Sequence, residues 1–229
     1  MARSNIIIIA VLILFLSGCF SNKENNYLLE ANKTLKYGKE NFEVDYSKEG
    51  LVSHFPDKIT YKPIVISVDP PACPPSYECS AQFGNMYLIC KADSTIDYIP
   101  TNVIFETEYL CDSNIIIDLL ELRRSIFPVD KCNKWYENRI PIPYFESYNF
   151  ELGTKEIKKE VGGETHYKYI YSIPSDLKVY VIQAESGNFW KESCNEKRPE
   201  KLKEWKNGYS KGVAISQKEN IVVYWSMLW

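Results

Sequence analysis

The stretch GVAISQKENIVVYWSMLW, residues 212–229, decides the fold of this chain. Its two apolar runs, 212–216 and 221–227, flank the polar residues 217–220, and two such runs around a short polar turn are typical of a β-hairpin. The last residues, Tyr224-Trp225-Ser226-Met227-Leu228-Trp229, carry too much apolar surface to remain unpaired in water. We therefore expect 221–227 to be a central or well-covered strand of a large sheet.

Strand patterns dominate the rest of the chain. Segments rich in β-branched and aromatic residues, bounded by turn residues, cover 63–68, 85–91, 103–110, 144–152, 167–173 and 179–184, with turns at Gly162-Gly163 and Ser175-Asp176. These strands follow one another with few helices between them, which disfavours a doubly wound βαβ fold. The sequence predicts an α+β fold: a single domain with a mainly antiparallel sheet, a few helices and disulfides.

Helical patterns are fewer than strand patterns. They cover 27–37, 47–52, 114–127 and 199–208, whereas 129–143 is expected to be a long loop. The segment 114–127 carries the strongest pattern, because its Ile and Leu residues recur at helical spacing. The first helix is expected to end at Gly38, since glycine commonly follows the last helical turn.

Composition narrows the class of protein. Of 229 residues, 45% are hydrophobic and 14% aromatic, which is enough to build a core. The 27 basic and 30 acidic residues leave a net charge of −3, and the cluster from Glu196 to Lys206 mixes acids with bases. A nucleic-acid partner is therefore not expected, since such proteins concentrate positive charge on one face.

The first residues read as a targeting segment. Arg3 supplies a positive charge, and the apolar run 6–16 is shorter than the roughly 20 residues that span a bilayer. Leu16-Ser17-Gly18-Cys19 then resembles the lipobox of bacterial lipoprotein precursors, which is cleaved before a cysteine that carries diacylglycerol on its sulfur. An uncleaved anchor over residues 4–22, all uncharged, is the alternative.

That resemblance implies a cellular location and three segments of the chain. Residues 1–18 would be the lipoprotein signal peptide, 19–26 a lipidated tether, and 27–229 a single globular domain. The acyl chains on Cys19 would hold the protein in the cell envelope, because two or more chains anchor stably. Phe20, where inner-membrane retention signals have Asp, favours the outer membrane if the cell has two membranes. Orientation toward the periplasm or the cell surface stays open.

Cysteines support an exported protein. Apart from Cys19 there are six: Cys73, Cys79, Cys90, Cys111, Cys132 and Cys194. Six cysteines in an oxidising compartment are candidates for disulfides, in any of fifteen pairings. One guess joins Cys73 to Cys79 and Cys90 to Cys111, leaving Cys132 with Cys194. Zinc is not expected, because Cys-x₂-Cys spacing is absent and the chain has only two histidines.

No motif in the sequence points to catalysis or to a cofactor. His54 is interpreted as fixing a turn and His166 as an exposed residue after one. Phosphate-binding loops, the nucleophile elbow and the zinc-protease helix are absent, and no spacing singles out a carboxylate pair among the 30 acidic residues. Aromatic residues gather at Trp135-Tyr136, Tyr144-Phe145, Phe189-Trp190 and the last residues, where filling a β-rich core is the simpler interpretation.

Two functions remain as hypotheses. The first is a cell-envelope lipoprotein with a binding or structural role, contacting an envelope protein or a glycan through aromatic residues. The alternative is an envelope hydrolase that uses carboxylate residues. The globular part resembles the many bacterial lipoproteins that have no assigned activity, so the resemblance adds no substrate or partner beyond the membrane.

Overall fold

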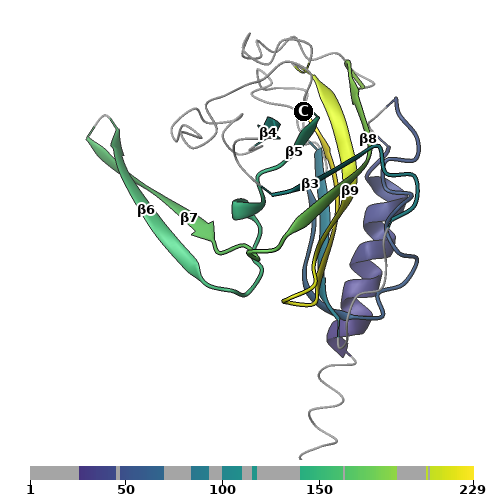
Figure 1. The fold of residues 1–229 in the computed structure, drawn as a ribbon, viewed down its shortest axis with the longest axis horizontal. Helices are drawn as coiled ribbons and strands as arrows, with labels where there is room; N and C mark the ends of the chain where they lie inside the picture. Colours follow the sequence, from purple (N-terminus) through teal and green to yellow (C-terminus); the bar gives the residue numbers. More distant parts are fainter. Residues whose placement is uncertain are drawn as a thin grey trace, which may run out of the picture.

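A computed structural model describes residues 26–44, 47–69, 84–92, 100–109, 115–117, 140–161, 163–189, 205 and 207–229. Within them, one α-helix over residues 26–41 lies against a six-stranded antiparallel sheet (Figure 1). Two smaller two-stranded sheets accompany it, one of them standing clear of the main body. The predicted α+β class with a mainly antiparallel sheet is confirmed.

The main sheet has the strand order β1-β2-β10-β9-β8-β3. The strands are β1 (Lys62–Asp69), β2 (Gly84–Lys91), β3 (Phe105–Glu108), β8 (Lys178–Ser186), β9 (Gly208–Ser216) and β10 (Ile221–Leu228), and every neighbouring pair is antiparallel. The predicted C-terminal hairpin is β9–β10, and β10 lies between β2 and β9 as expected of a central strand. Strands predicted over 63–68, 85–91, 103–110 and 179–184 are also present.

Both faces of this sheet are buried, each in its own core. Alternate residues of β10 point to opposite sides, so Val223, Trp225 and Met227 enter one core while Val222, Tyr224 and Leu228 enter the other. A strand covered on both faces is apolar throughout instead of alternating. This explains the apolar run from Ile221 to Leu228, which Ser226 alone interrupts.

The 26–41 helix covers the second core. Ala31, Leu35 and Phe42, at helical spacing, are buried against the sheet. The helix does not end at Gly38 as predicted. A Cβ at Gly38 would lie 2.7 Å from Met86 Cε and 2.8 Å from Val68 Cγ2, so this glycine lets helix and sheet approach closely.

Several other predictions were wrong. Ile115–Ile117, the start of the predicted 114–127 helix, is strand β4, paired in parallel with β5 (Pro141–Pro143) inside the predicted loop. Three successive β-branched residues suit a strand better than a helix. The predicted strand 144–152 instead holds the 3₁₀ helix η2 (Phe145–Ser147), because the side chains of Tyr144, Phe145 and Tyr148 turn together into the first core.

Two further segments, 47–52 and the hairpin of residues 154–171, also differ from the predictions. Residues 47–52 form turns instead of a short helix, and the Glu43 carboxylate accepts the N–H groups of Gly50 and Val52, each at 3.0 Å. Strand β7 (Glu164–Tyr171) matches the predicted strand 167–173, but its partner β6 (Thr154–Val161) was missed. Residues 118–127 and most of the predicted 199–208 helix lie outside the described residues.

Gly212 lies where β9 packs tightly against its neighbours β8 and β10. A Cβ there would collide with the Tyr180 carbonyl oxygen and the Trp225 ring, neither of which can move without disturbing the sheet. Gly212→Ala should therefore lower the free energy of unfolding by at least about 3 kcal/mol, measured by urea denaturation. Ser210→Ala is the control, because the buried Ser210 hydroxyl lacks a hydrogen-bond partner among the described atoms and its loss should be near neutral. Equal destabilisation by the two substitutions would contradict this account.

Candidate functional site

The β6–β7 hairpin is a separate arm that projects from the body of the protein (Figure 1). Its strands pair from Thr154 opposite Tyr171 to Val161 opposite Glu164. Gly163 at the tip has a φ of +85°, a conformation that favours glycine. Eight residues per strand, at about 3.3 Å each, give the arm a length of roughly 26 Å. Among the described residues, neither strand pairs with a strand of another sheet.

One face of the arm carries a row of tyrosines. Residues opposite each other in an antiparallel pair share a face, so Tyr169 lies beside Glu156 and Tyr167 beside Lys158. Tyr167 and Tyr169 are each 55% exposed, in contrast to the buried aromatic residues of the sheet. We call this face the tyrosine face; its members are Thr154, Glu156, Lys158, Glu160, Thr165, Tyr167, Tyr169 and Tyr171.

Charged neighbours order the exposed rings. The Lys158 ammonium lies 5.3 Å from the centroid of the Tyr167 ring and 3.6 Å from a Glu156 carboxylate oxygen. A hydrogen bond to the Glu156 carboxylate raises the pKa of Tyr169, so this hydroxyl stays protonated and donates to Glu156. The face thus presents aromatic surface and hydrogen-bonding groups together, the combination found where proteins bind partners.

The base of the arm is fixed to the body. The Ser172 N–H donates to the Gly153 carbonyl at 2.9 Å and closes the β6–β7 ladder, whereas Leu152 and Ile173, which pack against the first core, attach the arm to the body. Gly153 has a φ of +119°, which lets the chain leave the core and enter β6. The arm therefore begins at an anchored junction instead of a freely swinging one.

The aromatic clusters noticed in the sequence lie elsewhere. Tyr144 and Phe145 are buried in the first core, as are Trp225 and Trp229. Phe189 is half-buried against Tyr209, and the 135–136 cluster lies outside the described residues. The tyrosines of β7 occur at every second position of the strand. This alternation supported the strand prediction, and it could also have indicated an aromatic face.

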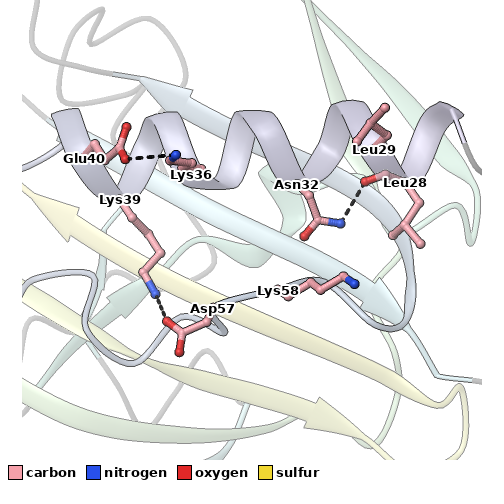
Figure 2. Close-up of a pocket in the computed structure, with 8 residues that line it drawn as sticks. All are labelled: Leu28, Leu29, Asn32, Lys36, Lys39, Glu40, Asp57 and Lys58. Atoms are coloured by element: carbon pink, nitrogen blue, oxygen red, sulfur yellow. Dashed lines mark hydrogen bonds and ion pairs between the residues drawn. The ribbon is translucent and has the colours of Figure 1, made fainter.

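A second candidate is a groove of about 670 Å³ between the 26–41 helix and residues 57–58 (Figure 2). Leu28 and Leu29 lie at one end, and the rest is mostly charged. Lys39 crosses it to Asp57 at 2.7 Å, and Lys36 lies 3.8 Å from Glu40 along the helix.

The charged side chains of this groove pair with one another. The contact with Lys39 lowers the pKa of Asp57, whereas a carboxyl that acts as a general acid needs a raised pKa. Lys39 also donates to the carbonyl oxygens of Phe55 and Pro56, at 3.3 and 3.5 Å. These contacts fasten the 55–57 loop to the helix, so the groove gives no support to the alternative of a carboxylate hydrolase.

A third candidate is a polar cluster between the 50–54 turns and the sheet. His54 Nε2 lies 2.9 Å from the Trp225 carbonyl oxygen. Lys211, 5% exposed, donates to the Gly50 carbonyl and lies 3.4 Å from Ser53 Oγ. Burial lowers the pKa of Lys211. The Ser53 hydroxyl nevertheless directs its proton to the Gly50 carbonyl, at 2.8 Å, and not to the Lys211 amine. The cluster therefore ties the turns to β9 and β10, and His54 fixes a turn as the sequence suggested.

His54 makes stability depend on pH. Burial, and next the charge of Lys211, lower the pKa of His54 from 6.5 to about 3. The unfolded chain binds a proton near pH 6.5 and the folded chain does not, so stability is complete above pH 6.5 and falls as the pH drops toward 3. At about 1.4 kcal/mol per pKa unit, the expected loss is on the order of 5 kcal/mol. Urea unfolding at a series of pH values measures it.

The matched variant of this experiment is His54→Gln, which removes the titrating group. Its unfolding free energy should depend less on pH between 6.5 and 3 than that of the wild type. His166→Gln is the control, because His166 lies half-exposed on the arm, away from the sheet. A wild-type slope retained in His54→Gln would show that other groups govern the acid response.

Of the six disulfide candidates, the structure describes one. Cys90 carries a free thiol, 2% exposed in the second core. Its side chain points toward the helix-covered side with Leu88 and Met86, and burial raises its pKa to about 12, so the thiol is unreactive. Cys73, Cys79, Cys111, Cys132 and Cys194 lie outside the described residues, as does Cys19.

The described part of the chain shows no metal site and no membrane-crossing helix. It contains no group of three or more His, Cys, Asp or Glu side chains arranged to hold a metal ion. No described helix is both long and apolar enough to cross a bilayer. Neither a family model, nor a curated protein, nor a solved structure matches this chain. The arm is thus the feature on which a function can be argued.

Proposed function

We propose that this chain is a lipid-anchored protein of the bacterial cell envelope that binds a protein partner through the tyrosine face of its arm. The observation that carries the proposal is the exposure of Tyr167 and Tyr169 on a hairpin that stands away from both cores. A two-stranded hairpin is marginally stable in water on its own. A partner that covers the tyrosine face would bury its apolar area and stabilise it.

The chemistry of the face favours a protein over a glycan. Tyrosine is among the residues that contribute most to protein–protein binding, because it buries a large rigid surface at small entropic cost. Glu156, Lys158 and Glu160 lie along the neighbouring strand and carry both signs of charge, as the polar rim of a protein interface does. Such a rim can select a partner by charge as well as by shape.

Lipid attachment at Cys19 is the other half of the proposal. It is supported by the lipobox Leu16-Ser17-Gly18-Cys19 and by the short apolar run before it. A lipid anchor confines the protein to the membrane surface, where partners in the same envelope are concentrated. The outer membrane is the proposed location in a cell with two membranes.

The anchor is tested by metabolic labelling with a fatty-acid probe. The wild-type protein should take up label, and Cys19→Ala should take up none, because the diacylglycerol is attached through that sulfur. Cys90→Ala is the matched control, since the buried Cys90 thiol is inaccessible to acylation. Label retained by Cys19→Ala would overturn the lipoprotein assignment.

The binding role is tested by a photo-crosslinking residue, benzoylphenylalanine, placed in the full chain in cells. At position 169 it should yield a protein adduct of discrete mass, which Tyr167→Ser with Tyr171→Ser should reduce at least tenfold. At position 37 it should not, although Tyr37 on the helix is equally exposed, at 57% against 55%. Adducts with glycan alone, or the same adducts from both positions, would overturn the protein-binding proposal.

A further inference from the structure

The 26–41 helix begins at the same end of the main sheet as β1. The Tyr27 hydroxyl donates to the carbonyl of Ile64, early in β1, at 3.4 Å, whereas Gly38 lies against Val68 near the end of that strand. Helix and strand therefore run in the same direction. We call the end where both begin, the lower end in Figure 1, the basal end. It comprises the first helical turn 26–29, residues 58–61, and the strand ends at Lys62 and Lys91.

The first helical turn exposes apolar side chains. Tyr27 and Leu29 are 53% and 54% exposed, and Leu28 between them is half-buried. Tyrosine and leucine side chains in such positions are typical of protein surfaces that enter the boundary between lipid headgroups and acyl chains. Water alone gives these side chains no favourable contact for their apolar area.

Lysines surround this turn. Lys62 on β1 lies directly opposite Lys91 on β2, and both are exposed. Like charges in opposite positions of neighbouring strands destabilise a sheet. Lys58 is exposed as well, and its ammonium group points toward Leu28 at the start of the helix (Figure 2). Among the described residues, none of the three lysines forms an ion pair, so an anion at the basal end would relieve their repulsion.

The carboxylates of the neighbouring turns do not offset these lysines. Asp176 accepts hydrogen bonds from the Ser216 hydroxyl and the Lys218 N–H, which hold the β9–β10 turn. Lys218 and Glu219, adjacent in that turn, balance each other in charge. In the part of the chain that the structure describes, the basal end and these turns together remain positive.

The proposed lipid anchor brings the basal end close to the membrane. Residue 26, where the helix begins, is the seventh residue after Cys19. Seven residues reach at most about 25 Å when fully extended. The basal end is therefore the part of the described body that acyl chains on Cys19 would hold nearest to the lipid.

We propose that the basal end rests on anionic phospholipid headgroups, an inference that rests on the lipid anchor of the proposed function and adds a second contact with the membrane. Lys58, Lys62 and Lys91 lie against the headgroup phosphates, which attract basic residues near the membrane surface. Tyr27 and Leu29 enter the boundary beneath them. In Figure 1 the tip of the arm is directed away from the basal end, so this contact presents the tyrosine face to partners away from the lipid.

The experiment measures how close two positions of the full acylated chain come to the lipid. The chain carries a dansyl amino acid at position 29 or 44 and is reconstituted into vesicles of phosphatidylcholine and phosphatidylglycerol, some with nitroxide on the headgroup. Leu29 and Val44 are both aliphatic and 54% exposed, but Val44 follows the far end of the helix. The nitroxide should quench the dansyl group at least threefold more at position 29 than at position 44.

The lysines are tested by Lys62→Gln with Lys91→Gln, which should at least halve the quenching at position 29. Vesicles of phosphatidylcholine alone should have the same effect, because they lack the negative surface charge. Lys33→Gln with Lys36→Gln is the matched control. It makes the same change in charge on the same helix, at exposed lysines that pair with Glu30 and Glu40, and should leave the quenching unchanged.

Flotation of the vesicles separates the contact from the anchor. A chain that floats with the vesicles but is quenched equally at positions 29 and 44 overturns the contact and leaves the anchor intact. Quenching at position 29 that persists in Lys62→Gln with Lys91→Gln also overturns it. A chain whose intact mass shows no acyl group, and which does not float, overturns the anchor and the contact together.

Discussion

The structure depends on the burial of β10, which is paired along both edges and covered on both faces. Its residues pair with β2 from Ile221 to Leu228 on one side and with β9 on the other. After it, Trp229 exchanges two backbone hydrogen bonds with Gly208, and its indole N–H donates to the Trp205 carbonyl at 2.8 Å. A strand so enclosed requires a layer on each face. The 26–41 helix and η2 meet that requirement on opposite sides, which leaves the arm outside both cores.

The sequence revealed those parts of the fold whose burial is complete. The run 221–228 is apolar except for Ser226, and a strand enclosed on both faces accommodates it. Strand β6 escaped notice because its charged side chains face solvent and show no apolar alternation. The prediction at Gly38 was wrong because a glycine that ends a helix cannot be distinguished in the sequence from one that allows a close neighbour. Only the structure shows Met86 beside Gly38. Ile115 and Ile116 fitted the 3.6-residue period together with the leucines that follow them, and this pattern hid the strand preference of three successive β-branched residues.

The candidate site was only half visible in the sequence. Tyrosines at positions 167, 169 and 171 mark a strand with one aromatic face, and a turn at Gly162-Gly163 marks a hairpin. Whether such a face enters a core or meets a partner depends on what the rest of the chain places over it. In β10 the sheet and η2 surround Trp225, whereas Tyr169 on β7 is 55% exposed. That difference lies in tertiary packing and not in local pattern.

Because the arm lies outside both cores, substitutions in the arm and in the sheet affect different properties of the protein. The arm contributes Tyr167 and Tyr169 to solvent and none of its strand residues to either buried cluster, so substitutions there alter association with little effect on the stability of the sheet. Substitutions in β9 or β10 act in the opposite way, because every residue of these strands is buried. Binding specificity can therefore vary by changes in residues 154–171 while the sheet that carries the arm stays the same. The packing of Leu152 and Ile173 against the first core lies outside residues 154–171, so it keeps the arm in place through such changes.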